Sequence, residues 1–302
     1  MRDRIDQIVQ NLNKTIVGKE APIRLVLVAL LSGGHVLLED VPGVGKTLLA
    51  KSLARCIDGK FQRIQCTPDL LPSDVTGTNI WNPSSGAFQF LPGPVFANIL
   101  LTDEINRATP RTQSALLEVM EEHQVTLDGV SRPVPDPFFV IATQNPVEYQ
   151  GTFPLPEAQM DRFALSLSLG YPSADEELKM LHNLSQPVKP ADLAPCITLD
   201  EMYSLQQQCQ QIKVEESVQQ YMINLVRATR DHEDVALGVS PRGTVALYRA
   251  VQALAFLEDR DYVLPDDVKT LAAPVLAHRL IASGGHKSAP IIDQLLNTVA
   301  IP

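Results

Sequence analysis

Short, continuous apolar runs mark the first half of the chain. Three of them have the composition of fully buried strands in a parallel sheet: His35–Leu38, Asn98–Leu101 and Phe138–Ala142. Helical patterns and Gly/Pro turns alternate with these runs as far as about Gly170. This alternation predicts an α/β domain, with a parallel sheet flanked by helices, over residues 1–170.

Polar residues follow each predicted strand. The three pairs are Glu39-Asp40, Asp103-Glu104 and Gln144-Asn145. Ligands of open α/β sheets bind beyond the carboxyl ends of the strands. We therefore expect these polar strand ends to converge on one site.

Beyond Gly170 the strand signals largely stop. One amphipathic helix is indicated by apolar residues at i, i+3, i+4, i+7 and i+8, namely Val218, Tyr221, Met222, Leu225 and Val226. Ser173 and Glu176 fit a capping box that opens another helix. Pro241 and Pro265 suit the first turns of two more. The second half, residues 171–302, is therefore predicted to be an all-helical domain.

Two segments have the signature of β-hairpins. In Thr76–Phe96 two short apolar runs flank a stretch of turn formers, and in Gln124–Val130 the dipeptide Asp128-Gly129 supplies a tight turn. Trp81, the only tryptophan, lies in the first segment. It is either an anchor of the hairpin or a contact for a partner. We expect an anchor, because a lone Trp usually packs.

The composition fits a globular protein of about two domains. The chain has 302 residues, of which 45% are hydrophobic and 20% charged, and this is too apolar for a disordered protein. No apolar run reaches the length of about 18 residues that a membrane span needs. The first residues carry charges throughout and lack the apolar centre of a signal peptide, which predicts a cytoplasmic protein.

Charge and cysteine usage narrow the class further. The 25 Lys and Arg residues against 35 Asp and Glu give a formal net charge of −10, which argues against sequence-independent binding to nucleic acid. The four cysteines, Cys56, Cys66, Cys196 and Cys209, form no C-x-x-C pair, and no HExxH motif accompanies them. They predict free buried thiols in a reducing cytoplasm rather than a zinc site or a disulfide framework.

The first predicted strand leads directly into a glycine-rich turn. The turn is Glu39-Asp-Val-Pro-Gly-Val-Gly-Lys-Thr47, and a helical pattern follows it. A strand, such a turn and a helix form the context of a phosphate-binding P-loop. Gly43 and Gly45 let the backbone approach a triphosphate. Lys46 supplies a charge for the β- and γ-phosphates, and the Thr47 hydroxyl is a Mg²⁺ ligand.

The other two strand ends carry groups that suit the same chemistry. Asp103 can hold a hydrated Mg²⁺ and Glu104 can polarise an attacking water, since two adjacent carboxylates at a buried strand end are costly without a cation nearby. The alternative, that both only cap the next helix, is disfavoured beside a P-loop. Asn145 can hydrogen-bond a γ-phosphate or the attacking water, or it is simply the turn residue before Pro146.

Together these segments resemble the MoxR family of AAA+ ATPases. The resemblance rests on motifs that occur in order over nearly the whole chain: Glu39–Thr47, Thr102–Ala108, Thr112–Glu118, Ala142–Pro146 and Pro154–Phe163. It implies a P-loop AAA+ core followed by a C-terminal helical lid domain. Asp40 stands where the strict P-loop motif has glycine, but an aspartate is common at this position in the family.

The resemblance implies the residues of an ATP site: Val17, Gly18, Pro42, Gly43, Val44, Gly45, Lys46, Thr47 and Leu48. The first two match the segment that usually contacts adenine. Thr47 and Asp103 are the implied Mg²⁺ ligands. Glu104 is the implied Walker B glutamate, and Asn145 looks like sensor 1.

Two arginines complete the implied machinery. Arg162 matches the arginine-finger position, which acts on ATP bound by a neighbouring subunit, and Arg242 looks like sensor 2 on the lid. An arginine that reaches a phosphoryl group in transfer accelerates hydrolysis strongly. From the local sequence alone, Arg162 is a salt-bridge partner of Asp161 or Glu157, and Arg242 is a solvated residue at a helix start.

The implied function is Mg²⁺-dependent ATP hydrolysis by a homo-oligomeric ring, expected to be a hexamer. The family's task is chaperone-like: it remodels or activates a protein partner, often one with a von Willebrand factor A domain, and in some cases for metal-cofactor insertion. The two hairpins match the two insertions of this clade, which the lid would move on hydrolysis.

Three other functions stay open. A DNA-translocating motor related to the minichromosome maintenance helicases shares both hairpins. However, neither Thr76–Phe96 nor Gln124–Val130 contains the Lys or Arg that a DNA-tracking hairpin would present. A magnesium-chelatase-type ATPase subunit is a close relative. A nucleotide-dependent scaffold would bind ATP and change shape without useful hydrolysis.

Overall fold

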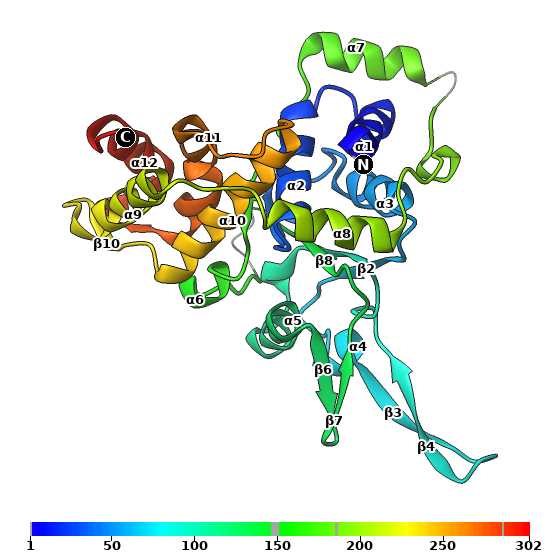
Figure 1. Ribbon diagram of the computed structural model, residues 1–302. Coiled ribbons are helices and arrows are strands. Elements are labelled where there is room, and N and C mark those ends of the chain that lie inside the picture. Colours follow the sequence, from blue (N-terminus) through cyan, green and yellow to red (C-terminus); the bar gives the residue numbers. More distant parts are fainter. Residues whose placement is uncertain (1, 146–150, 185–186, 286) are drawn as a thin grey trace.

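The structure is a computed structural model that describes residues 2–145, 151–184, 187–285 and 287–302. Within this part of the chain, a five-stranded parallel sheet forms the centre of the first half (Figure 1). The strands stand in the order β2-β5-β8-β1-β9, with the bounds Phe61–Gln65, Ile99–Asp103, Phe139–Gln144, Val36–Glu39 and Leu165–Leu167. Because all five run in the same direction, their carboxyl ends meet at one edge of the sheet.

Side chains alternate between the two faces of this sheet. Leu37 and Leu100 enter the core that the sheet shares with α5 (Pro110–Glu122). Their sequence neighbours Leu38 and Leu101 enter the core on the opposite face. The helices on that face are α1 (Arg2–Thr15), α2 (Glu20–Leu31) and α3 (Lys46–Cys56). Burial on both faces explains why the strands are continuous apolar runs.

Helices dominate the second half. They are α7 (Ala174–Asn183), α8 (Leu199–Cys209), α9 (Glu216–Asp231), α10 (Pro241–Leu257), α11 (Pro265–Leu276) and α12 (Ser288–Thr298). The expected helix starts are confirmed, since Ser173 caps α7 in a capping box with Glu176, and α10 and α11 begin at Pro241 and Pro265. A short antiparallel ribbon, β10 (Val235–Leu237) with β11 (Ile281–Ala282), is added to the helices.

Both predicted hairpins are present, and both project from the same end of the molecule (Figure 1). The first consists of β3 (Gly77–Asn82) and β4 (Ala87–Pro92), the second of β6 (Gln124–Leu127) and β7 (Val130–Pro133). Asp128 and Gly129 have φ values of 52° and 76°, as a type I′ turn requires. The hairpins touch, because Asn79 donates to Asp128 at 2.6 Å and the Arg132 guanidinium lies 4.2 Å from the Phe90 ring centroid.

Shorter helical segments connect these elements: α4 (Pro72–Thr76), α6 (Glu157–Met160) and the 3₁₀ turns Ile105–Arg107, Pro190–Asp192, Ala277–Arg279 and Ser283–Gly285. The sequence patterns did not indicate the two edge strands, β2 and β9. β2 is mostly polar and only partly buried, and β9 is three residues long. Each central strand begins one residue later than expected and runs on into the polar residues that follow it.

The expectation that Trp81 anchors the first hairpin is wrong. Trp81 is 55% exposed and packs edge-to-face on Phe88, itself 71% exposed, with the ring centroids 5.3 Å apart. Ile80 and Leu91 are also exposed, on the opposite face of the same two strands. We call Trp81 and Phe88 the hairpin apolar patch. The second hairpin also runs beyond the expected segment to Pro133 and so includes Arg132.

Four other sequence expectations have different outcomes. The four cysteines are buried and free, as expected. Of the helices in the described ranges, none is long and apolar enough to cross a membrane. The boundary between residues 170 and 171 stays a prediction. Pro146, which forms the expected turn with Asn145, lies outside the described residues.

Candidate active site

The glycine-rich turn joins the end of β1 to the start of α3, at the carboxyl edge of the sheet. Gly43 and Gly45 have φ values of 89° and 100°, and a Cβ added at either would meet no atom within 4 Å. Such backbone favours glycine. The N-cap residue of α3 is Gly45, so no side chain at that position caps the first N–H groups of the helix, which begins at Lys46. The turn therefore offers backbone donors and an open approach to an anion.

Asp40 fixes the start of this turn. Its buried carboxylate accepts hydrogen bonds from the Ser168 hydroxyl at 2.6 Å and from the N–H groups of Leu169 at 2.7 Å and Gly170 at 3.0 Å. The carbonyl of Asp40 accepts from Lys46 Nζ at 3.0 Å. The aspartate thus ties the turn to the chain that follows β9, where the strict motif has glycine.

Asp103 and Glu104 lie at the end of β5, at the same edge. Asp103 Oδ2 accepts from Arg63 Nε at 2.7 Å, and its Oδ1 accepts from Thr143 Oγ1 at 3.2 Å. Glu104 adopts φ 56° and ψ 51°, a left-handed conformation that is rare without glycine. Its Oε2 pairs with Arg107 Nη1 at 3.2 Å. Backbone strain of this kind clusters at functional sites.

These groups line one cavity of about 370 Å³. Its lining residues are Pro42, Gly43, Gly45, Lys46, Thr47, Leu48, Arg63, Gln65, Asp103, Glu104 and Thr143. The structure therefore brings together the predicted phosphate-binding turn and the predicted acid pair. Val44 lies instead on a neighbouring cavity of about 350 Å³, with Tyr171, Pro172 and residues of α7.

Val17 and Gly18 lie between α1 and α2 and are not among the lining residues of the larger cavity. Gly18 packs on α7 so closely that a Cβ would come within 1.9 Å of Glu176. Lys19 Nζ donates to the Tyr171 carbonyl at 2.9 Å. These contacts hold the segment against the helix that borders the cavity of Val44.

The third strand end contributes a residue that the sequence did not indicate. Thr143 Oγ1 accepts from the Glu104 N–H at 2.9 Å and donates to Asp103, so it links the two acids. Asn145 follows β8 directly at the same edge and is 9% exposed. It does not line the cavity of Glu104.

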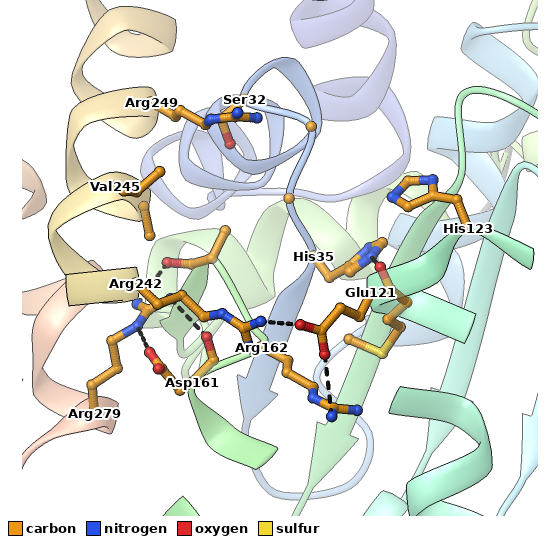
Figure 2. Close-up of a pocket in the computed structure, with 15 residues that line it drawn as sticks. Ser32, His35, Glu121, His123, Asp161, Arg162, Arg242, Val245, Arg249 and Arg279 are labelled. Atoms are coloured by element: carbon orange, nitrogen blue, oxygen red, sulfur yellow. Dashed lines mark hydrogen bonds and ion pairs between the residues drawn. The ribbon is translucent and has the colours of Figure 1, made fainter. Parts of the chain in front are cut away.

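Arg162 and Arg242 lie elsewhere, around Glu121 of α5 (Figure 2). Arg162 Nη2 is 3.2 Å from Glu121 Oε2, and Arg242 pairs with the other oxygen of the same carboxylate. All three residues line a cavity of about 270 Å³ that also includes Gly34 and His35, just before β1. This arginine pair therefore lies at the amino edge of the sheet.

The length of β1 separates the arginine pair from the phosphate-binding turn. An extended chain from His35 to Asp40 spans about 16 Å, at about 3.3 Å per residue. The structure does not bring Arg162 or Arg242 to the turn of their own chain. Arg249, two helical turns along α10 from Arg242, lines the same amino-edge cavity.

A buried ion pair supports this cluster. Arg279 Nε donates to Asp161 Oδ1 at 2.7 Å, and the two side chains are 2% and 18% exposed. Burial lowers the pKa of the Arg279 guanidinium, and the Asp161 carboxylate opposes that shift. The Ser240 hydroxyl, at the N-cap of α10, donates to Asp161 Oδ2 at 2.7 Å.

His35 lines the same cavity as the arginine pair and is buried. Its Nδ1 accepts from the Val140 N–H at 3.1 Å, so its Nε2, 3.1 Å from the Met120 carbonyl, carries the proton. Burial lowers the pKa of His35 to about 4, and the charge of nearby His123 adds to the shift. The ring is therefore neutral at neutral pH.

Sequence reasoning missed three charged residues of these two sites. Glu121 lies within a helix and belongs to no motif that marks it. Arg63 lies on β2, a strand that was not expected. Arg279 carried a weak signal. It lies in the 3₁₀ turn after α11 and interrupts the apolar stretch that ends that helix, and a buried arginine needs a partner.

The residues present fit a magnesium-bound triphosphate. The turn is open at its glycines, and the N-cap glycine of α3, Gly45, has no side chain to cap the first N–H groups of the helix. Thr47 and Asp103 border the same cavity, and hydroxyl and carboxylate oxygens are ligands that Mg²⁺ prefers. No group of three or more His, Cys, Asp or Glu side chains forms a metal cluster within the described ranges. A metal at this site would therefore take its other ligands from phosphate oxygens and water.

Comparisons with known proteins extend over both halves of the chain. Residues 35–165 match the ATPase family associated with various cellular activities (AAA), and residues 227–296 match the AAA lid domain. YeaC of Bacillus subtilis is 49% identical over 99% of this chain and 95% of its own. Chaperone MoxR1 of Mycobacterium tuberculosis is 41% identical over 99% of this chain and 82% of its own. A crystal structure from Cytophaga hutchinsonii, 39% identical, has a TM-score of 0.93 and covers 100% of this chain and 96% of that one.

These matches agree with the geometry. The AAA match contains the turn and strand ends of the carboxyl-edge cavity, and the lid match contains the helices that carry Arg242 and Arg279. The 41% identity to MoxR1 extends over 99% of the chain, so the relationship includes both sites. The protein is an ATPase and belongs to the MoxR family of AAA+ proteins.

Proposed function

We propose that this protein hydrolyses ATP with Mg²⁺ in a head-to-tail ring of subunits and uses the energy to remodel a protein client. The observation that carries the proposal is the separation of the phosphate-binding turn from the arginine pair. Arg162 and Arg242 lie at the edge opposite their own turn, so they are available to the turn of a neighbour. Repeated head-to-tail contacts close into a ring, which we expect to be a hexamer.

Within one subunit, the turn and the acid pair divide the work of hydrolysis. The turn's N–H groups and Lys46 would bind the phosphates, and Thr47 with Asp103 would hold Mg²⁺, which neutralises charge on the phosphate oxygens. Glu104 would polarise the attacking water, with Asn145 as a hydrogen-bonding sensor of the γ-phosphate. The cavity of Val44, flanked by the Val17 segment, is apolar enough to suit adenine.

Glu121 defines the resting state of the arginine pair. Its carboxylate binds both Arg162 and Arg242 at the place where a neighbour's phosphate would bind them. A triphosphate carries more negative charge than one carboxylate and would displace it. Arginine supplied in this way stabilises the charge that spreads over the γ-phosphoryl oxygens in the transition state.

A chaperone-like task is supported by the name of one relative, Chaperone MoxR1. The hairpin apolar patch also fits a protein client, since β3 and β4 contain no charged residue. A client with a von Willebrand factor A domain, and a part in metal-cofactor insertion, follow from the family resemblance. A magnesium-chelatase-type role would use the same nucleotide site with a different client. The four free buried thiols suit the reducing cytoplasm.

The variant Glu104→Gln tests the proposal. It should bind ATP normally and lose turnover by at least about a hundredfold, because the amide cannot polarise water. Held in the ATP state, it should retain its client in a pulldown, whereas Lys46→Ala, which loses the phosphate contact, should retain none. Wild-type hydrolysis by Glu104→Gln would contradict the role of Glu104.

A further inference from the structure

Several hydrogen bonds from the Arg279 side chain hold the segment that carries Arg162, and His278 Nε2 lies 3.1 Å from the Phe163 carbonyl of the same segment. Besides its bond to Asp161 Oδ1, Arg279 donates to the carbonyls of Asp161 at 3.3 Å, Phe163 at 2.5 Å and Ala164 at 3.1 Å. These carbonyls lie on both sides of Arg162 in the chain. The guanidinium therefore fixes the backbone from which Arg162 extends.

A second set of contacts joins the same segment to Arg242. Asp161 Oδ2 accepts from Ser240, whose hydroxyl also accepts from the Gly243 N–H at 3.4 Å and so caps α10. Arg242 is the second residue of that helix. One carboxylate, that of Asp161, thus connects the backbone of Arg162 with the helix start that presents Arg242. Figure 2 shows its contact with Arg279.

We propose that Asp161 and Arg279 are positioning residues, which hold Arg162 and Arg242 in the one geometry that a neighbour's ATP requires. The inference rests on the proposed function, in which both arginines act on the next subunit. Charge stabilisation by an arginine depends on its placement, and a shift of about 1 Å can cost on the order of a hundredfold in rate. Neither residue contacts the nucleotide, so their effect passes through the arginine pair.

The chain contains a matched ion pair without this connection. Arg260 pairs with Asp267 at 2.6 Å, and these side chains are 19% and 8% exposed. Both residues lie within the helical half, and Asp267 accepts from the Leu264 N–H at the start of α11. This pair stabilises the fold in a comparable way but holds no part of the arginine pair. It therefore separates loss of stability from loss of positioning.

The first experiment compares Asp161→Asn with Asp267→Asn. Asp161→Asn should lower kcat by on the order of tenfold, with less than about twofold change in KM for ATP, because its own turn is intact. Asp267→Asn should lower the melting temperature to a similar extent and leave kcat unchanged. The inference would be overturned if Asp161→Asn kept the wild-type kcat, or if both variants lost kcat to the same extent.

The second experiment mixes subunits. Glu104→Gln subunits cannot hydrolyse their own ATP but carry an intact arginine pair, so they should restore hydrolysis by Asp161→Asn subunits. Arg162→Ala, mixed in the same way, tests the proposed function on its own. If Glu104→Gln subunits do not restore hydrolysis by Arg162→Ala subunits, the proposal that the arginines act on the neighbouring subunit is wrong. With restoration of Arg162→Ala but none of Asp161→Asn, only the positioning role is wrong.

A milder variant keeps the test decisive if Asp161→Asn folds poorly. Ser240→Ala removes one hydrogen bond to Asp161 and leaves the ion pair with Arg279 in place. It should lower kcat by about threefold, and Glu104→Gln subunits should reverse the loss. An unchanged kcat in Ser240→Ala would contradict the coupling of the two arginines through Asp161.

Discussion

Glu121 binds two arginines, Arg162 and Arg242, with one carboxylate. Its partners are partly exposed, so each pair contributes at most about 1 kcal/mol. Glu121→Gln should weaken both pairs and free the arginines for a neighbour's phosphate. We expect ATPase activity at limiting protein concentration to rise by about twofold to fivefold. Steady-state hydrolysis measured across protein concentrations checks this outcome.

Glu122→Gln is the matched control for that measurement. It removes the same charge from the next position of α5, and Glu122 is an exposed residue outside the amino-edge cavity. Its activity should equal that of the wild type. A fall in activity in Glu121→Gln would mean that the carboxylate orients the arginines instead of competing for them.

His35 makes stability depend on pH. Its pKa is about 4 in the folded protein against 6.5 for an ordinary histidine, so between these values only the unfolded chain binds the proton. The stability that comes from keeping His35 neutral is therefore complete above pH 6.5, and it is lost as the pH falls towards 4. The free energy of unfolding should fall by up to about 1.4 kcal/mol per pH unit from this residue. Burial lowers the pKa of His278 too, so it adds in the same direction.

Denaturant unfolding at several pH values measures this slope. His35→Asn should be less stable than the wild type at pH 7. Below pH 7, its free energy of unfolding should change less steeply with pH, by the amount that the uptake of about one proton contributes. An unchanged slope in the variant would show that His35 does not titrate on unfolding.

At the residue scale, local chemistry decided what the sequence could indicate. The turn of Lys46 and the acids Asp103 and Glu104 were predictable, since each stands directly after a strand and its role depends on near neighbours. Glu121 and Arg279 were not, because their partners lie far away in sequence: Arg279 and Asp161 are 118 residues apart. Only the packing of the two halves brings such residues together.

The first hairpin exposes large apolar side chains that are not buried in the core. The double variant Trp81→Ala with Phe88→Ala should keep wild-type ATPase activity, because the hairpin apolar patch lies outside the nucleotide cavity. It should lose client capture in the Glu104→Gln background, by at least about tenfold, if the patch is the contact. A pulldown with ATP measures the captured client for the Glu104→Gln protein with and without the two hairpin substitutions.

Tyr203→Ala provides the control, since Tyr203 is an aromatic residue on α8 that is also about half exposed. It should leave capture unchanged. Retention of the client by the hairpin variant, or equal loss in the control, would remove the patch from the contact surface.

The sequence predicted the strands whose two faces are both buried. The central strands β1, β5 and β8 are covered on both faces, and their apolar runs indicated them to within about two residues. The edge strand β2 is mostly polar and only partly buried, so it contains no such run. The hairpins were predictable for another reason, because their turns need special residues such as Gly129, whose φ is 76°.

For the whole molecule, we expect hydrolysis per subunit to rise with protein concentration. A dilute subunit has its turn but no arginines beside it, so its rate should be low until neighbours associate. The rate should climb by on the order of a hundredfold or more between dilute and assembled protein. Hydrolysis measured against concentration, with sedimentation on the same samples, checks this. A rate near zero at every concentration would favour a nucleotide-dependent scaffold.

DNA binding should be weak at moderate salt. The net charge is −10, and the Arg132 side chain of the second hairpin is stacked on Phe90 rather than presented to a partner. A salt titration of DNA binding tests this expectation. Tight binding that falls steeply with salt would favour the DNA-translocating motor instead.

The arrangement of the whole molecule was the least predictable level. The resemblance indicated that Arg162 serves a neighbour, but it left the location of Arg242 open. That location depends on how α10 packs on α2 and on how β9 pairs with β1, with Val36 opposite Leu165. Neither contact has a signal in the local sequence. Only the assembled fold reveals that both arginines share one carboxylate at the amino edge.

Because β1 separates the arginine pair from the turn of the same chain, the activity of rings that mix two variants should depend on their proportions. In the proposed ring, each contact between neighbours would have a direction, with a turn on one side and arginines on the other. In an equal mixture of Glu104→Gln and Arg162→Ala subunits, about one contact in four is intact on both sides. Activity plotted against composition should therefore form a symmetric arch that vanishes at both pure ends. If the two sites met within one chain, no mixing ratio would produce any activity.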